Sequence, residues 1–255
     1  MLSWTTISSV EYSLFSSHVS LIFRNVPSNL FAFDLSSNNL EGPVPVFVVL
    51  PSSKQLGLGS NKLRTFPDFL RIQTYLRKLD LSKNQVQGQV PNWIWGLSHL
   101  YNLNLSCNAL VSLEGPLIKS TSPVNILDLH SNQLKGPILL FLPRAVYMDY
   151  SSAPMYHRTL VIKNLHGLIP ASICNVNELI ILDLSNNSLS GRIPQCLGAM
   201  SNLRRNNLTG TISNFEFLEN SDLKPLELNR NQIQGQFPKS LANCSGEVPR
   251  VALTT

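Results

Sequence analysis

The chain has 255 residues, of which Leu makes up about 17% and Asn about 10%, whereas charged residues make up only 14%. The formal net charge of +5 comes from 20 basic and 15 acidic side chains that are spread along the chain, so no basic stripe for nucleic acid is indicated. No apolar run reaches the roughly 18 residues of a membrane helix, and the first residues do not resemble a signal peptide.

One short phrase recurs along the chain, and its clearest copy, LDLSNNSLSGRIP, runs from Leu182 to Pro194. Other copies lie at Phe33 to Pro45, Leu56 to Pro67, Leu79 to Pro91, Leu103 to Leu110, Leu127 to Ile138 and Leu226 to Pro238. Each copy is anchored by one Asn: Asn38, Asn61, Asn84, Asn108, Asn132, Asn187, Asn206 and Asn231. Intervals of 23 or 24 residues separate the first five of these, which is typical of leucine-rich repeats.

Each part of the phrase has a structural role. The two Leu of the Leu-x-Leu pair point to one face of a short strand, and stacking such strands about 4.8 Å apart buries that face. The Asn amide can satisfy backbone groups where the chain leaves the sheet. We therefore expect an α/β-type leucine-rich repeat solenoid. It should be a curved right-handed superhelix with a parallel β-sheet on its concave face and an irregular or 3-10 convex side.

The expected solenoid covers residues 29–244 in about eight to ten repeats, after a poorly matching segment 1–28 and before a non-repeat tail 245–255. Two intervals are short. Ala153 and Lys163 both align with the anchoring Asn although they are ten residues apart, which suggests that about fourteen residues are missing. Asn187 and Asn206 are 19 residues apart, about five fewer than usual. We therefore expect breaks in strand pairing near 153–163 and 200–206, and an incomplete gene product.

Three GxIP-like phrases resemble the plant-specific class of this repeat: Gly88 to Pro91, Gly167 to Pro170 and Gly191 to Pro194. Longer phrases at 89–95, 170–175 and 238–244 resemble ectodomains of plant receptor-like proteins of the disease-resistance type, and the match covers about residues 30–244. The resemblance implies an ectodomain fragment on the extracellular face of the plasma membrane. It also implies that a membrane span and a short tail follow the ectodomain, and that partner receptor kinases relay ligand sensing.

The outward residue inside each Leu-x-Leu pair forms an acidic row, namely Asp34, Gly57, Asp80, Asn104, Asp128, Asp149, Asp183 and Glu227. Asp is usual at this position of the repeat, so consensus geometry is the favoured interpretation and ligand binding is the alternative. Neighbours that depart from the common pattern carry more information about specificity. The candidate ligand-binding residues on the concave face are Arg77, Lys78, Asp80, Lys83, Tyr101, Asn102, Asn125, Asp128, His130 and Asp183.

Cysteines and sequons supply the remaining candidates. Cys174 and Cys196 lie in adjacent repeats and can form a disulfide if their Cα atoms approach within about 7 Å; otherwise both are unpaired. Cys107 and Cys244 are expected to stay unpaired. If the chain is extracellular, the N-x-S/T sequons make candidate glycan acceptors of Asn104, Asn186, Asn207 and Asn243.

No motif indicates catalysis. The Cys and His residues lack metal-ligand spacing, and no phosphate loop or nucleophile elbow is present, so we expect neither an enzyme nor a cofactor or metal. The leading hypothesis is a recognition ectodomain that binds a peptide, protein or glycan in defence or developmental signalling. The alternatives are a secreted inhibitor resembling the polygalacturonase-inhibiting proteins and a non-functional gene remnant.

Overall fold

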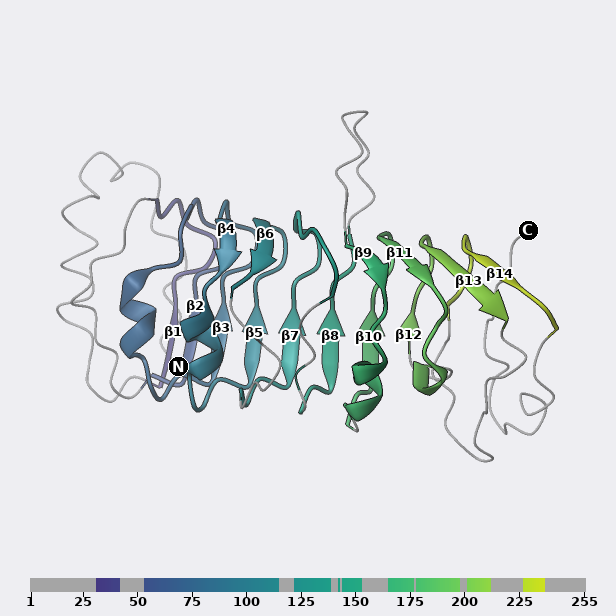
Figure 1. Cartoon of the computed structure of the whole chain (residues 1–255). Coiled ribbons are helices and arrows are strands. Elements are labelled where there is room, and N and C mark those ends of the chain that lie inside the picture. Colours follow the sequence, from purple (N-terminus) through teal and green to yellow (C-terminus); the bar gives the residue numbers. More distant parts are fainter. Residues whose placement is uncertain are drawn as a thin grey trace. The chain divides into compact units, whose positions relative to one another are not determined.

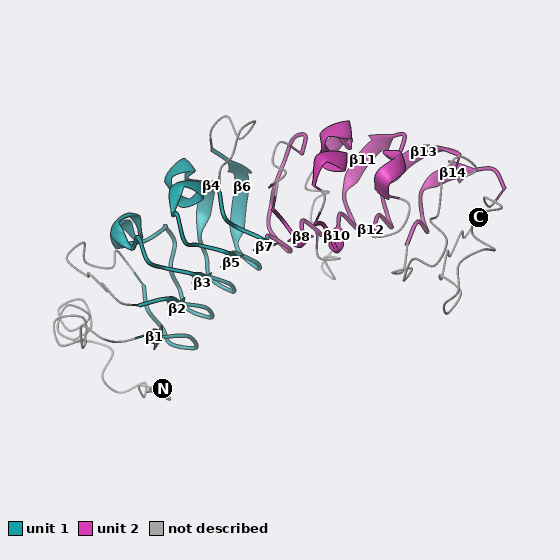
Figure 2. Cartoon of the chain, turned by 90° about the horizontal axis from the view of Figure 1, so that it is seen from below, with its two compact units in different colours: residues 1–128 teal, residues 129–255 magenta. Residues whose placement is uncertain are grey.

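The computed structural model describes residues 31–41, 53–114, 122–138, 142, 144–152, 165–176, 178–197, 201–211 and 227–236. The chain divides into two compact units, residues 1–128 and 129–255 (Figure 2). Each unit is a parallel β-solenoid whose short strands form a first sheet, and some turns of unit 1 and the described turns of unit 2 also contribute to a second sheet. The predicted leucine-rich repeat solenoid is thus confirmed.

In unit 1, five strands form the first sheet, all parallel and paired in chain order (Figure 1). They are β1 (Ala32–Asp34), β2 (Gln55–Gly57), β3 (Lys78–Asp80), β5 (Asn102–Asn104) and β7 (Ile126–Asp128). The second sheet and the 3-10 helices of this unit are β4 (Gln87–Val90), β6 (Ala109–Leu113), η2 (Asp68–Ile72) and η3 (Asn92–Gly96).

Unit 2 repeats this arrangement. Its first sheet contains β8 (Tyr147–Asp149), β10 (Ile181–Asp183) and β12 (Ser201–Asn202). Its second sheet contains β9 (His166–Leu168), β11 (Ser188–Gly191), β13 (Asn207–Thr211) and β14 (Gln232–Gln234), and its 3-10 helices are η5 (Ala171–Asn175) and η6 (Gln195–Leu197).

The core is built from columns of Leu. Strand pairing places Leu56, Leu79 and Leu103 opposite one another, and each is at most 2% exposed. A second column forms two residues further along the chain, where Leu58 and Leu81 are fully buried. Burying one such side chain contributes about 1.5 to 3 kcal/mol. A single turn cannot bury these faces alone, so the stability of each unit comes from contacts between neighbouring turns.

The anchoring Asn side chains connect successive turns. The Asn61 amide donates to the carbonyl oxygens of Leu58 in its own turn and Leu35 in the preceding turn, both at 3.0 Å. Its Oδ1 accepts from the Leu40 N–H at 3.0 Å. The same pattern of bonds to the preceding turn recurs at Asn84, Asn108, Asn206 and Asn231. Among the described residues, Oδ1 of Asn38 has no donor.

The residue before each anchoring Asn adopts a left-handed backbone conformation. These residues have φ between 52° and 60° and are Ser37, Ser60, Lys83, Cys107, Ser131, Asn186, Arg205 and Arg230. Such a conformation is unfavourable for residues other than Gly and persists only where surrounding bonds fix it. Here the turn is fixed from the next repeat, as in the bond from Lys83 N–H to the Ser106 carbonyl at 2.9 Å.

The expected break in strand pairing near 153–163 is wrong. β10 pairs directly with β8, with Ile181 opposite Tyr147 and Asp183 opposite Asp149. Ile181 follows its partner by 34 positions, whereas Asn102 follows Lys78 by 24. Positions 147–180 therefore form one repeat that is about ten residues longer than usual, not two repeats that lack fourteen.

The additional residues lie between the first and second sheets of that repeat. β9 begins 17 positions after Asp149, whereas β11 begins five positions after Asp183. Beyond the long connection the regular arrangement resumes, because Leu165 bridges Gly136 and Gly167 pairs with Leu189. Ala153 and Lys163 lie outside the described residues, as do the predicted domain limits at 28–29 and 244–245.

The expected break near 200–206 is also wrong, because β12 pairs with β10. The shortening lies between Pro194 and β12, because Ser201 follows Pro194 by 7 positions, whereas Leu103 follows Pro91 by 12. Ser201 pairs with Leu182 and takes the usual Leu position of the core column. Its buried hydroxyl donates to the Leu197 carbonyl at 3.0 Å. This bond satisfies a polar group that would otherwise destabilise the core.

Two cysteines connect consecutive repeats of unit 2. Cys174 in η5 and Cys196 in η6 form a disulfide with a Cα–Cα distance of 5.6 Å, the pairing that the sequence suggested. Cys107 lies in one of the left-handed turns, and Cys244 lies outside the described residues.

The Asn ladder leads to a first prediction. Replacing Asn61 by Ala should lower the free energy of unfolding by about 2 to 4 kcal/mol, because the Leu40 N–H loses its acceptor and the Leu35 and Leu58 carbonyls each lose one of their donors. Asn38→Ala should cost about 1 kcal/mol, because the Oδ1 of that residue accepts no bond from the described chain. Urea unfolding followed by circular dichroism measures both values. Equal losses at the two positions would contradict the role assigned to the ladder.

The disulfide leads to a second prediction. Replacing Cys174 and Cys196 together by Ala should lower the free energy of unfolding by about 3 kcal/mol, the value expected for a loop of about 20 residues. Dithiothreitol should lower the melting temperature of the wild type to about that of the double variant. It should leave the melting temperature of the double variant unchanged. Cys107→Ser is the control and should keep the sensitivity to reductant. A wild type that melts identically with and without reductant would refute the bond.

Candidate ligand-binding face

The solvent face of the first sheet in unit 1 carries three parallel rows of side chains. The row before the strands, which we call the basic–aromatic row, consists of Phe31, Lys54, Arg77, Tyr101 and Asn125. The middle row consists of Ala32, Gln55, Lys78, Asn102 and Ile126. The carboxylate row consists of Asp34, Gly57, Asp80, Asn104 and Asp128. A ligand on this face would contact one residue of each row per turn.

Backbone hydrogen bonds fix the spacing of the basic–aromatic row. The N–H of Lys54 donates to the Phe31 carbonyl, and that of Arg77 to the Lys54 carbonyl, both at 2.8 Å. Tyr101 and Asn125 continue the series with bonds of 3.0 and 2.9 Å. The side chains of the row are therefore held about 4.8 Å apart, the distance between neighbouring strands.

Two cations on this part of the face lie against aromatic rings. The Lys54 ammonium lies 5.1 Å from the Phe31 ring centroid, and the Lys78 ammonium lies 5.9 Å from that of Tyr101. Each such contact contributes about 0.5 to 1 kcal/mol at an exposed site and restricts where the charge lies. Within the described chain, neither Lys forms an ion pair, and neither does Arg77. Among the described residues, no carboxylate therefore pairs with these three cations.

The carboxylate row has a structural role in addition to its charge. Oδ1 of Asp80 accepts the Ser82 N–H at 2.8 Å, and Asp34 makes the equivalent bond to Ser36 at 2.9 Å. These bonds close the turn after each strand and explain why Asp is usual at this position. The consensus interpretation of the row is therefore supported. The second oxygens of Asp34 and Asp80 face outward, where they can accept from a ligand.

In unit 2, the equivalent row consists of Asp149, Asp183, Asn202 and Glu227. Burial raises the pKa of Asp183, and the nearby Asp149 carboxylate adds to the increase, whereas bonds from Ser185 and Asn202 oppose it. The Asn202 amide donates to Oδ2 of Asp183 at 2.9 Å. Asn202 was not predicted from the sequence, because the repeat that precedes it is short. Counting back four positions from the anchoring Asn206 would have found it.

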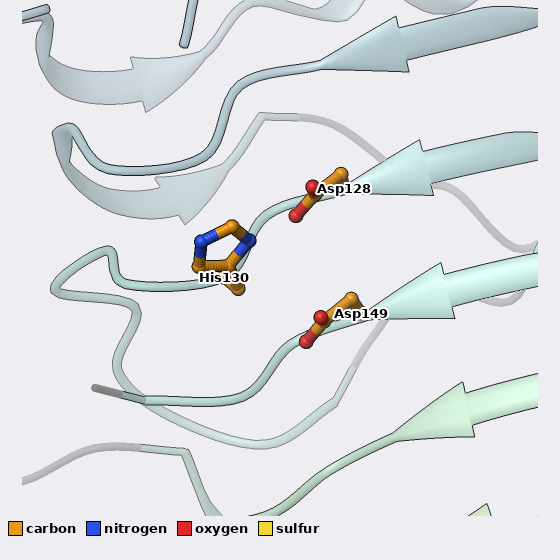
Figure 3. Close-up of side chains that lie close together, drawn as sticks. All are labelled: Asp128, His130 and Asp149. Carbon is orange, nitrogen blue, oxygen red and sulfur yellow. The ribbon is translucent and has the colours of Figure 1, made fainter. Parts of the chain in front are cut away.

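His130 also belongs to unit 2, where its ring lies beside Asp149 (Figure 3). A ring nitrogen of His130 is within 4.8 Å of a carboxylate oxygen of Asp149, whose Oδ2 also accepts from the Tyr147 hydroxyl at 3.1 Å. Asp128, drawn in the same figure, is the last residue of β7 in unit 1.

The structure distributes the ten predicted site residues over both units. Seven lie on the first-sheet face of unit 1: Arg77, Lys78, Asp80, Tyr101, Asn102, Asn125 and Asp128. Lys83 is exposed in a turn beyond the carboxylate row, and His130 and Asp183 belong to unit 2. Phe31 and Lys54 were missed, although both lie two positions before a Leu-x-Leu pair, as Arg77 and Tyr101 do.

The sequons occupy different environments. Asn104 is in the carboxylate row, where its Oδ1 accepts from Ser106. Asn186 is in a left-handed turn and accepts from Arg205 at 3.1 Å. Asn207 is exposed on β13 of the second sheet, and Asn243 lies outside the described residues. Glycan attachment at these positions stays a prediction.

Comparison with known proteins agrees with this architecture. The family model for the Leucine Rich Repeat matches residues 75–97 and 178–200. Receptor-like protein 6 of Arabidopsis thaliana is 40% identical over 166 residues, which cover 62% of this chain and 16% of the relative. The chain belongs to the plant leucine-rich repeat receptor-like proteins. It spans about a sixth of the length of that relative.

Solved structures extend the likeness to receptor-kinase ectodomains. The plant peptide hormone receptor RGFR1 in complex with RGF2 matches 88% of this chain with a TM-score of 0.68 and 28% identity. The Arabidopsis receptor kinase HAESA, in complex with the peptide hormone IDA and the co-receptor SERK1, matches 80% with a TM-score of 0.57 and 27% identity. This receptor-like protein chain covers 36% and 35% of those two chains.

The raised pKa of Asp183 leads to a third prediction. The folded chain holds this proton more tightly than the unfolded chain, so the carboxyl opposes folding increasingly as the pH rises from the ordinary Asp pKa toward neutrality. Asp183→Asn removes this titration, and Asn can still accept the Ser185 N–H. Relative to wild type, the variant should become more stable between about pH 4 and pH 7. Urea unfolding at both pH values measures the difference, and a constant difference would contradict the prediction.

Proposed function

We propose that this chain is a ligand-recognition segment of a plant receptor-like protein and that it binds a peptide on the first-sheet face of unit 1. The observation that supports this proposal most directly is the group of three cations, Lys54, Arg77 and Lys78, which lie beside two aromatic rings and form no ion pair within the described chain. Solvent-facing charges at fixed spacing are suited to recognition. Peptide complexes of the structural relatives support the choice of ligand class.

Recognition on this face needs little rearrangement. The backbone of the sheet is fixed by strand pairing, and ring contacts restrict Lys54 and Lys78, so little side-chain entropy would be lost on binding. Exposed aromatic rings supply apolar contact area, and the cations supply orientation. The proposed activity is therefore binding without catalysis.

The proposed setting is the extracellular face of the plasma membrane, in defence or developmental signalling. Receptor kinases are the proposed signalling partners, and this part of the proposal rests on the family and on the co-receptor in the HAESA complex. No helix in the described part of the chain is long and apolar enough to cross a membrane.

A fourth prediction tests whether the face binds ligands. The full chain, secreted from plant or insect cells, is used to select binders from a displayed library of random 12-residue peptides. Peptides selected on the wild type should lose at least tenfold in affinity for the double variant Arg77→Glu/Lys78→Glu, because it reverses the charge of the face.

The matched control is Lys62→Glu/Arg64→Glu, which makes the same change of net charge at exposed positions of unit 1 outside the three rows. The selected peptides should bind this control as they bind wild type. Failure to select any peptide, or equal binding to all three proteins, would overturn the proposed function.

A further inference from the structure

We infer that the ligand of unit 1 is an extended peptide segment in which acidic and basic side chains alternate. The inference rests on the proposed function and specifies the chemistry of the ligand. It follows from the two opposite charges that the first-sheet face presents along two parallel lines. These are the cations Lys54, Arg77 and Lys78 on one side and the carboxylates Asp34, Asp80 and Asp128 on the other.

The two lines of charge are separated along the strand direction. Arg77 precedes Asp80 by three residues, which is about 10 Å along an extended strand, and Lys78 precedes it by two, which is about 6.7 Å. Between Arg77 and Asp80 lie only Lys78 of the middle row and the buried Leu79. A ligand lying across the strands would therefore meet positive charge at β2 and β3 on one side and negative charge at β1, β3 and β7 on the other.

An extended peptide matches such a surface because its side chains point alternately to opposite sides. Acidic residues at every second position would face the cations, and basic residues at the positions between them would face the carboxylates. Five strands spaced about 4.8 Å apart span about 19 Å, which corresponds to about six extended residues. The motif that fits is short.

Ligands of a single sign fit this face less well. A polyanion, including an acidic polysaccharide, would gain from Lys54 and Arg77 but would be repelled by Asp34 and Asp80. A polycation would be attracted by Asp34 and Asp80 but repelled by Lys54 and Arg77. The carboxylates cannot turn away, because one oxygen of each accepts a backbone N–H of its own turn. The rings beneath Lys54 and Lys78 similarly restrict the cations. A face that holds charges of both signs in fixed positions therefore favours ligands whose acidic and basic side chains occur in a matching order.

The test uses two synthetic peptides of equal composition. The alternating probe consists of four Glu-Lys repeats, and the block probe consists of four consecutive Glu followed by four consecutive Lys, so the two have the same length and net charge. Both are acetylated and amidated, which removes the terminal charges. Fluorescence anisotropy with the full chain at low ionic strength should give at least tenfold tighter binding of the alternating probe. Equal binding of the two probes, or tighter binding of the block probe, would overturn the inference.

Two further probes and the variants test the assignment of the two edges. One-sided peptides of four Glu-Ser repeats or four Lys-Ser repeats, with the same blocked ends, should both bind more weakly than the alternating probe. Arg77→Glu/Lys78→Glu should weaken the alternating probe at least tenfold and strengthen the Lys-Ser peptide. Lys62→Glu/Arg64→Glu should leave the binding of both peptides unchanged. Circular dichroism of both variants checks that they are folded. A Glu-Ser peptide that binds as tightly as the alternating probe would overturn the inference, because only the cations would then be used.

The outcome separates this inference from the proposed function. If library peptides bind the face and lose affinity in the double variant, but the alternating probe binds no better than the block probe, the proposed function stands and the charge pattern is wrong. If neither the library nor the alternating probe yields binding, both are wrong.

Discussion

The fold depends on one hydrogen-bonding unit, the side-chain amide of the anchoring Asn. Each amide has a donor group and an acceptor in a rigid plane, so it can bond to carbonyls of two successive turns and accept an N–H from the earlier one, as Asn61 does. No hydrophobic side chain could satisfy these backbone groups, which are removed from water by the Leu columns. The ladder therefore allows the chain to leave the sheet at the same place in every turn.

Because the first-sheet strand and the anchoring Asn amide fix how each turn stacks on the next, other parts of a repeat can vary in length. Partners in the first sheet are 24 positions apart at Lys78 and Asn102, 34 at Tyr147 and Ile181, and 19 at Leu182 and Ser201. The short repeat has fewer residues between Pro194 and its strand, and Ser201 stands at the core Leu position, where its hydroxyl donates to the Leu197 carbonyl. The long repeat gained residues between its two sheets. Neither change alters the register of the strands.

The repeat fold could be predicted because one pattern recurs along the chain at a nearly fixed interval. The pattern is a pair of Leu residues two positions apart, followed by the anchoring Asn, and each part has a physical role in the fold. The two expected breaks were wrong for a related reason. Counting intervals treats a repeat as a unit of constant length, whereas pairing depends only on the strand and the residues that flank it. The sequence named Arg77, Lys78 and Tyr101 because they depart from the consensus. It could not show that Lys54 and Phe31 complete their row, since ring contacts and missing ion pairs appear only in three dimensions.

The long repeat has an evolutionary consequence. The chain between Ser152 and Leu165 joins two positions that the sheets on either side hold in place. Lengthening a connection whose ends are already fixed changes stability slowly, by about 0.6 kcal/mol for each doubling of its length. Insertions there are close to neutral for folding, so selection can act on them for other properties. A lineage that carries this repeat can add or remove sequence at that point while every neighbouring turn remains unchanged.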